Sequence, residues 1–145
     1  MNARQLSQKI KVSTNTSTIG FYGESLALNG LRNSGLTVRT TASIKNGFYA
    51  DLFVNAKHRL EVKTAKQNKS GYFKICLNKS DKHGSTSLAH SDFVLVQCIS
   101  EIGLLYVFFI PSSELIGKKS INLSIGKKSK YNKFLSSYAA IGRVL

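Results

Sequence analysis

Two strongly apolar segments in the second half of the chain constrain its fold more than any other feature. They cover residues 92–99 and 104–110 and are separated by a short turn. Each has the length and the continuous apolar character of a strand that is covered on both faces of its sheet. The longest apolar run, residues 103–110, is far too short for a helix that spans a membrane. We therefore expect two central strands of a sheet in a soluble protein that has no membrane partner.

Shorter patterns surround these strands with further elements. Apolar residues that recur with helical period predict a helix over residues 19–33. Segments rich in β-branched residues or of alternating polarity predict more strands, and Asn46-Gly47 is a typical hairpin turn. The additional elements are expected as strands at 36–44, 49–54, 59–65 and 72–77, a helix start at 111–114 and a short helix within 131–144. This order predicts an α/β fold in which helices flank a mixed central β-sheet.

The length of 145 residues suits a single domain with its own core. Residues 1–18 are rich in Ser, Thr and Asn and are expected to form a polar arm or an extra strand. Residues 19–145 are expected to form the domain, and residues 116–145 its basic C-terminal extension. The N-terminus lacks the apolar segment of a signal peptide, and Cys76 and Cys98 lie in apolar runs that suit buried free thiols. These features favour the cytoplasm, near the nucleoid, or an organellar or viral equivalent.

The charge of the chain points to a polyanionic partner. There are 21 Lys and Arg residues against 7 Asp and Glu, a formal net charge of +14. Nucleic acid explains this charge better than an anionic membrane surface does. A pentapeptide, Ile-Gly-Lys-Lys-Ser, occurs at 116–120 and again at 125–129, and its lysines either contact phosphates or form a solvated loop. The lysines of the two copies are Lys118, Lys119, Lys127 and Lys128.

Glu24 lies among the apolar residues of the first expected helix. Phe21, Leu28 and Leu31 form one helical stripe, and Glu24 falls inside it. A carboxylate that faces the core destabilises the fold unless it is paired, protonated or bound to a metal. Two interpretations therefore remain: an ion pair with one of the many Lys or Arg residues, or a role in chemistry.

Asp51, Glu61 and Lys63 lie on two neighbouring expected strands. Glu61 and Lys63 are two residues apart, so both side chains point to one face of their strand. Asp51 comes near Glu61 if the two strands pair across the short turn at 55–58. Taken singly, Asp51 resembles a turn residue and Glu61 with Lys63 resembles an exposed salt bridge.

Taken together, these residues suit a divalent metal. Mg²⁺ is commonly held by one or two carboxylates together with waters and phosphate oxygens, and Mn²⁺ is expected to substitute for it. Asp51, Glu61 and the backbone carbonyl of Val62 would supply the protein ligands. If the bound phosphate belongs to a nucleic-acid backbone, Lys63 would orient the water that attacks the phosphorus. It would also stabilise the charge of the pentavalent transition state. A non-catalytic basic DNA-binding protein explains the net charge equally well but not this spacing.

The same motifs resemble those of the PD-(D/E)XK nuclease superfamily. Gly23-Glu24 on a first helix is followed by Ala50-Asp51, nine intervening residues, and then Glu61-Val-Lys-Thr-Ala65. The two apolar segments at 92–99 and 104–110 fit the family pattern as well. Ala50 departs from the family at the position of its name-giving proline. The resemblance covers about residues 19–115 and is strongest to small intron-associated homing endonucleases and weaker to archaeal-type Holliday junction resolvases.

The resemblance implies a restriction-endonuclease-like core and a Mg²⁺-dependent DNA endonuclease. It implies that Asp51 and Glu61 bind the metal, that Lys63 is catalytic and that Glu24 is an accessory acid. The expected substrate is duplex DNA cut at specific sites, as by a homing or restriction enzyme, and the alternative is a Holliday junction or other branched DNA. Further DNA contacts are expected from Arg39, Lys45 and Gln67.

Cutting both strands favours a homodimer or homotetramer. Residues with helical spacing in the C-terminal tail would form an oligomer face or pack on their own sheet. They are Phe134, Leu135, Tyr138, Ile141 and Val144.

Overall fold

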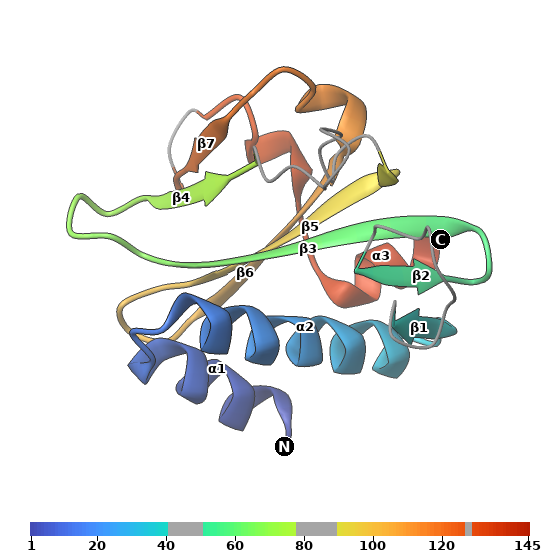
Figure 1. Cartoon of the computed structure of the whole chain (residues 1–145), viewed down its shortest axis with the longest axis horizontal. Helices are drawn as coiled ribbons and strands as arrows, with labels where there is room; N and C mark the ends of the chain where they lie inside the picture. Colours follow the sequence, from blue (N-terminus) through green and yellow to red (C-terminus); the bar gives the residue numbers. More distant parts are fainter. Residues whose placement is uncertain (41–50, 78–89, 127–128) are drawn as a thin grey trace.

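The computed structural model describes residues 1–40, 51–77, 90–126 and 129–145. Within these ranges the fold is α/β, with a mixed six-stranded sheet, three α-helices and a separate two-stranded sheet (Figure 1). The helices are α1 (Ala3–Val12), α2 (Thr16–Asn33) and α3 (Tyr138–Val144), and two short 3-10 helices are η3 (Ser112–Glu114) and η4 (Asn132–Phe134). The strands are β1 (Val38–Thr40), β2 (Leu52–Val54), β3 (His58–Lys66), β4 (Phe73–Cys76), β5 (Phe93–Ile99), β6 (Leu105–Pro111), β7 (Ser120–Leu123) and β8 (Leu135–Ser136).

The main sheet has the strand order β1-β2-β3-β5-β6-β8. β3 and β5 run parallel, and the other neighbours are antiparallel. The prediction of a mixed sheet with helices around it is therefore confirmed. β5 and β6 are both interior strands, as their apolar sequences indicate.

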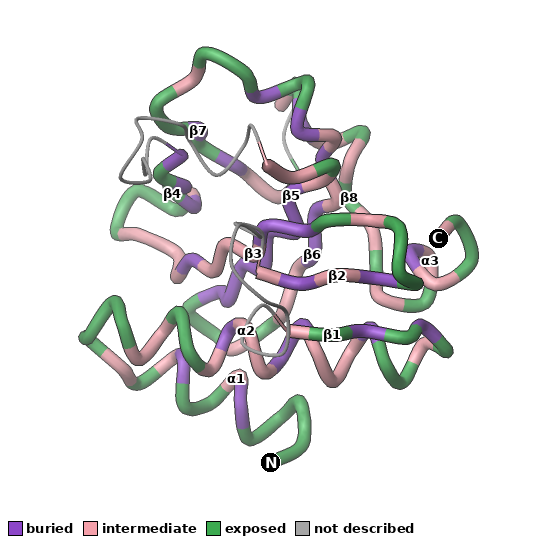
Figure 2. Tube along the Cα trace, turned by 45° about the vertical axis from the view of Figure 1, so that its right-hand side comes forward, coloured by how far each residue is buried: buried purple, intermediate pink, exposed green. Residues whose placement is uncertain are grey.

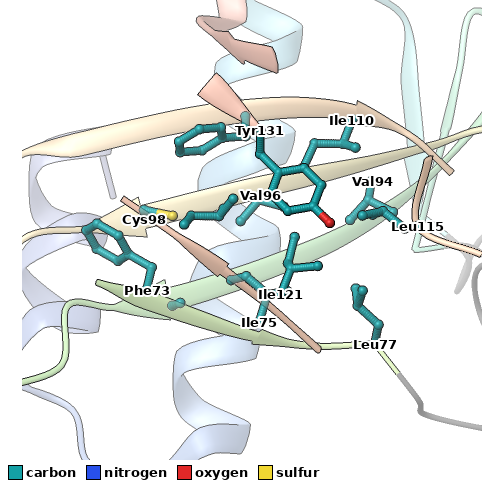
Figure 3. Packing of buried hydrophobic residues seen from close by; sticks show 13 residues of the cluster. Phe73, Ile75, Leu77, Val94, Val96, Cys98, Ile110, Leu115, Ile121 and Tyr131 are labelled. Carbon is teal, nitrogen blue, oxygen red and sulfur yellow. The ribbon is translucent and has the colours of Figure 1, made fainter. Parts of the chain in front are cut away.

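The two faces of the main sheet contact different layers (Figure 1). On β5, Val94, Val96 and Cys98 point toward the small sheet of β4 and β7, while Leu95 and Ile99 point toward the helices. Figure 3 shows side chains from β4, β5, β6 and β7 meeting in one apolar cluster. Because both faces of β5 are covered, its continuous apolar sequence is required by its position.

Residues Ala3–Val12 form helix α1, so the expectation of an arm or extra strand was wrong for this segment. Asn2 and Gln5 form a capping box, each side chain accepting a hydrogen bond from the backbone of the other. Leu6 and Ile10, one helical turn apart, are the two buried residues of the helix. Figure 2 shows the outer side of α1 exposed and its inner side against α2. Two apolar residues in a polar segment are a weak signal, although the capping pattern is present in the sequence.

Helix α2 begins three residues earlier than expected, with Asn15 as its N-cap. Its buried face is made of Gly23, Leu26, Ala27 and Leu31, whereas Phe21 is 68 % exposed. The predicted apolar stripe through Phe21 was therefore wrong. The small residues of α2 allow the helix backbone to approach the sheet closely, and hydropathy patterns give little weight to Gly and Ala.

The basic C-terminal segment contributes to the fold. β7 was not predicted; it pairs with β4 and buries Ile121 and Leu123 in the apolar cluster. The two copies of the pentapeptide place Gly117 and Gly126 on either side of β7, both with positive φ (82° and 73°). In each copy the glycine adopts a backbone conformation that other residues rarely take.

The C-terminal tail is only partly helical. Helix α3 is shorter than the predicted segment, because η4 and β8 precede it. Ile141 is buried, and Phe134 and Tyr138 pack on the protein's own core, while Leu135 and Val144 are exposed. Most of the tail thus packs on its own sheet.

Three other expectations concern local structure. The predicted helix start at 111–114 is the 3-10 helix η3. The Asn46-Gly47 turn and most of the expected polar loop at 78–90 lie outside the described residues. In the described part of the chain, every helix is too short or too polar to cross a lipid bilayer.

Substitution of Gly23 tests the close approach of α2. A Cβ at Gly23 would lie far inside van der Waals distance of Thr64 Oγ1, whereas a Cβ at Gly20 of the same helix meets nothing within 4 Å. We expect Gly23→Ala to lower the unfolding free energy by about 1–3 kcal/mol. Gly20→Ala should raise it by about 0.5–1 kcal/mol through helix propensity. Urea denaturation measures both, and equal effects of the two substitutions would contradict this packing.

Candidate functional site

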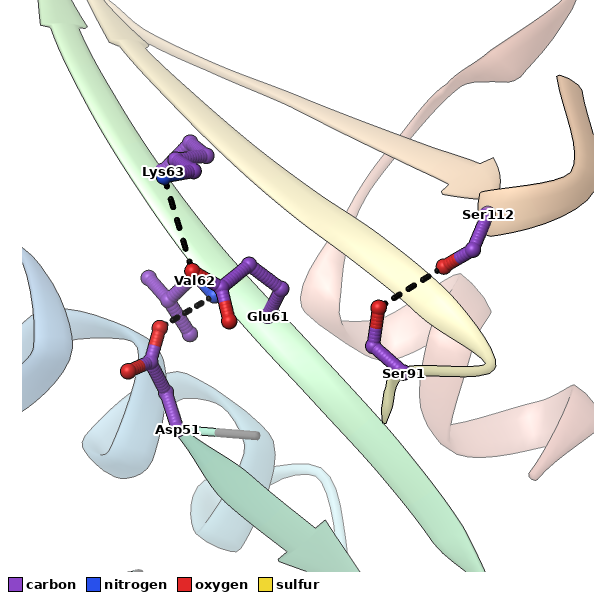
Figure 4. Close-up of polar contacts among 6 residues, drawn as sticks. All are labelled: Asp51, Glu61, Val62, Lys63, Ser91 and Ser112. Atoms are coloured by element: carbon purple, nitrogen blue, oxygen red, sulfur yellow. Dashed lines mark hydrogen bonds and ion pairs between the residues drawn. The ribbon is translucent and has the colours of Figure 1, made fainter. Parts of the chain in front are cut away.

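The turn between β2 and β3 brings Asp51 to its neighbours. Asn55 and Ala56 both have positive φ (53° and 55°), which gives the chain a tight reversal. The strands then pair from Leu52–Leu60 to Val54–His58. Beyond this pairing, Asp51 Oδ2 accepts a hydrogen bond of 2.8 Å from the backbone N–H of Val62 (Figure 4). The expected approach of Asp51 to the Glu61 segment is confirmed.

This hydrogen bond also fixes the direction of the Val62 backbone. In a β-strand the N–H and C=O of one residue point to the same edge. The Val62 carbonyl therefore points to the edge at which the Asp51 carboxylate lies. An oxygen from the main chain and a carboxylate are thus directed to one place.

Glu61 and Lys63 lie together on one face of β3, as the alternation predicts. Their closest atoms, Glu61 Oε1 and Lys63 Nζ, are 3.5 Å apart (Figure 4). Glu61 is 6 % exposed, and charged side chains are rarely buried to this extent. Removing these charges from water costs more free energy than an exposed salt bridge contributes. An ordinary surface ion pair therefore does not account for the burial of Glu61.

Helix α2 completes the site from the other side of the β3 edge. Glu24 lines the same pocket as Asp51, Glu61 and Lys63, and the pocket has a volume of about 390 Å³. Glu24 is half-buried at the border of the helix face, so its predicted position inside a core-facing stripe was wrong. The same border position directs Glu24 into the pocket. The four residues come from α2, the start of β2 and the middle of β3.

The electrostatics of the pocket are opposite to those of the whole chain. Among the described residues that line it are three carboxylates and one ammonium group, while the chain has a formal charge of +14. Burial raises the pKa of Glu24 above its ordinary value of 4.5, and the nearby charge of Asp51 raises it further. Repulsion between carboxylates is the condition that a bound cation relieves.

The donor set fits a hard divalent cation. Carboxylate and carbonyl oxygens are the ligands that Mg²⁺ prefers, and one or two protein carboxylates are enough for it. Among the described residues, no three His, Cys, Asp or Glu side chains lie close enough to one another to hold an ion. Asp51, Glu61 and the Val62 carbonyl could supply two carboxylates and one carbonyl to such an ion, and Glu24 lines the same pocket.

Of the other expected contact residues, those that the structure describes are not among the residues lining this pocket. Arg39 is an exposed residue of β1. The Gln67 amide joins two backbone segments, donating to the Gly71 carbonyl and accepting from the N–H of Glu101. Lys118 and Lys119 precede β7, on the opposite side of the main sheet (Figure 1). Lys45, Lys127 and Lys128 lie outside the described residues.

The pocket also contains residues that the sequence did not suggest. Thr16, Ser17 and Phe21, from the first turns of α2, line it beside the acids. The sequence feature that could have revealed them is Asn15, a favoured N-cap residue. A helix that begins after Asn15 places two hydroxyls and an aromatic ring on the turns that lead to Glu24. The site is therefore a polar pocket with one exposed aromatic wall.

The raised pKa of Glu24 predicts how stability depends on pH. The folded protein holds this proton more tightly than the unfolded chain, so folding weakens as the pH rises from 4.5 through the raised pKa. The stability of Glu24→Gln relative to the natural protein should therefore increase over that window and then level off. Urea denaturation at a series of pH values measures this difference. A difference that is the same at every pH would contradict the charge repulsion, and Asp51→Asn should make the dependence smaller.

Comparisons with known proteins assign no family. No protein-family model matches the chain, and no curated protein is significantly similar to it. The residues and geometry of the pocket are therefore the basis on which its function is argued.

Proposed function

We propose that this protein is a Mg²⁺-dependent endonuclease that hydrolyses phosphodiester bonds in DNA. In this proposal its core is restriction-endonuclease-like and belongs to the PD-(D/E)XK superfamily. One observation carries the proposal: Glu24, Asp51, Glu61 and Lys63 come from three separate elements and line a single pocket. A structural ion pair needs two of these residues, and a passive DNA-binding surface needs no carboxylate.

The overall charge supports a nucleic-acid substrate. A formal charge of +14 favours association with phosphates along an extended surface. The acidic pocket repels the same phosphates unless its charge is compensated. The combination suits a protein that holds DNA over most of its surface and admits one phosphate beside a cation.

Each residue of the pocket has a role that its environment supports. Asp51, Glu61 and the Val62 carbonyl would hold a divalent metal, which would neutralise charge at the phosphate and polarise a water. Lys63, 3.5 Å from Glu61, presents an ammonium group that stabilises charge on the phosphoryl oxygens and orients the attacking water. Glu24 would be the accessory acid of the site and would hold a second metal or a metal-bound water from the other wall of the pocket.

The exposed ring of Phe21 favours a second candidate substrate. Phe21 is 68 % exposed, lines the pocket one helical turn before Glu24, and contacts Tyr22 edge-on with ring centroids 5.5 Å apart. Aromatic side chains bind bases by stacking on a base face, and in a duplex those faces are covered by neighbouring bases. A free ring at this place supports branched DNA, such as a Holliday junction, beside the first candidate of site-specific duplex cleavage.

DNA cleavage with defined variants tests the proposal. Supercoiled plasmid, a library of duplex sites and a four-way junction are incubated with Mg²⁺, Mn²⁺ or EDTA. We expect cleavage of at least one substrate that EDTA abolishes and that Lys63→Ala or Glu61→Gln slows at least about a hundredfold. Lys74→Ala, which removes an exposed lysine of β4, is the matched control and should keep most of the activity.

The same assay separates the two substrate classes. Phe21→Leu should slow cleavage of the junction more than cleavage of duplex DNA if the ring stacks on a base face that is uncovered at the branch point. Equal loss on both substrates favours the site-specific duplex enzyme. Metal-independent binding without cleavage of any of these DNAs would contradict the endonuclease and leave a non-catalytic basic DNA-binding protein.

A further inference from the structure

A fully buried glutamine lies behind the pocket. Gln97 is in the middle of β5, 0 % exposed, on the face that points toward the helices. Its neighbours on that face, Leu95 and Ile99, are apolar. A buried amide destabilises the fold unless its donors and acceptor form hydrogen bonds. The hydrogen-bond partners of Gln97 therefore indicate what the amide does at this position.

The Gln97 amide has partners on three other elements. Its Nε2 donates to the Gly23 carbonyl of α2 at 2.7 Å and to Thr64 Oγ1 of β3 at 3.2 Å. Its Oε1 accepts a hydrogen bond from the Tyr138 hydroxyl of α3. The Gly23 carbonyl can only accept, which fixes the orientation of the amide. Burial raises the pKa of Tyr138, so its hydroxyl stays a donor at neutral pH.

Two of these partners adjoin residues of the site. Gly23 precedes Glu24 in α2, and Thr64 follows Lys63 in β3. Thr64 and Gln97 are also register partners in the parallel β3–β5 pairing. One side chain therefore joins the backbone beside Glu24 to the strand that carries Glu61 and Lys63.

Close contacts keep α2 in the position that these hydrogen bonds require. Gly23 packs directly on Thr64, and the ring of Tyr138 covers Gly30, where a Cβ would lie 2.5 Å from Tyr138 Cδ2. Gly23 and Gly30 are seven residues apart and thus lie on one face of the helix. Helix α2 is held at one glycine by β3 and at the next by α3, and Gln97 bonds to both partners.

We propose that Gln97 is a positioning residue of the pocket, which sets the depth and rotation of α2 on β3 so that Glu24 faces Asp51 and Lys63. Tyr138 completes the arrangement from α3, so the C-terminal helix supports the site without lining it. The role of this position in catalysis rests on the proposed endonuclease. The positioning of α2 can be measured without that activity.

The test compares Gln97→Met with Ile121→Ala. Methionine keeps the length of the side chain but makes none of the three hydrogen bonds. Ile121 is a buried residue of β7 in the apolar cluster and is not among the residues that line the pocket, so it controls for general loss of stability. Hydrogen exchange of the backbone amides is measured in the absence of DNA, and turnover and KM are measured on the best substrate.

In Gln97→Met we expect amide exchange to rise at least about tenfold in the turn of α2 around Glu24 and to stay nearly unchanged in β5. Turnover should fall about tenfold to a hundredfold with little change in KM, because misplacement of a reacting group lowers the rate more than it weakens binding. Ile121→Ala should show neither the local change in α2 nor the loss of turnover.

The outcomes separate the positioning from the proposed function. Faster exchange confined to α2, with a natural protein that cleaves no DNA, supports the positioning and contradicts the endonuclease. A natural protein that cleaves DNA, with Gln97→Met unchanged in turnover, overturns the positioning role. Equal loss of turnover in Ile121→Ala at equal stability overturns it as well. If Gln97→Met does not fold, Tyr138→Phe removes only the hydroxyl, and the same two measurements decide.

Discussion

The parallel pairing of β3 with β5 is the constraint on which the rest of the structure depends. Seven residue pairs, from Leu60–Phe93 to Lys66–Ile99, join these strands. Their register sets Thr64 opposite Gln97, and the contact of Thr64 with Gly23 then places α2. The same strand β3 receives the Asp51 hydrogen bond at Val62. The position of every acid in the pocket follows from this one strand and its two neighbours.

The acidic pocket and the basic chain are complementary parts of one electrostatic design. Positive charge spread over the protein attracts a polyanion, and its effect weakens as salt screens it. The carboxylates at one edge of β3 repel a phosphate group unless a cation is bound between them. Burial of Glu61 and the raised pKa of Glu24 both reflect the strain of this arrangement. Perturbed carboxylates of this kind cluster at functional sites, which supports the proposed metal site.

Much of the central architecture could be predicted from the sequence, because the signals were local. β3, β5 and β6 followed from apolar content and alternation, and the approach of Asp51 to β3 followed from a short turn between two strands. The rest depended on contacts between distant segments. The position of α2 is set by glycines that pack on Thr64 and Tyr138, and hydropathy patterns do not predict such contacts. The role of Gln97 could not be predicted for the same reason, since its hydrogen-bond partners lie on three other elements.

The most direct test of the central claim is binding of Mn²⁺ to the protein without DNA, followed by electron paramagnetic resonance. The account predicts saturable binding in the natural protein and its loss in the double variant Asp51→Asn, Glu61→Gln, with both proteins folded. It also predicts that excess Mg²⁺ displaces the Mn²⁺, because both ions use the same oxygen ligands. Equal binding by the natural protein and the double variant, or binding by neither, would contradict the claim that this pocket is a metal centre.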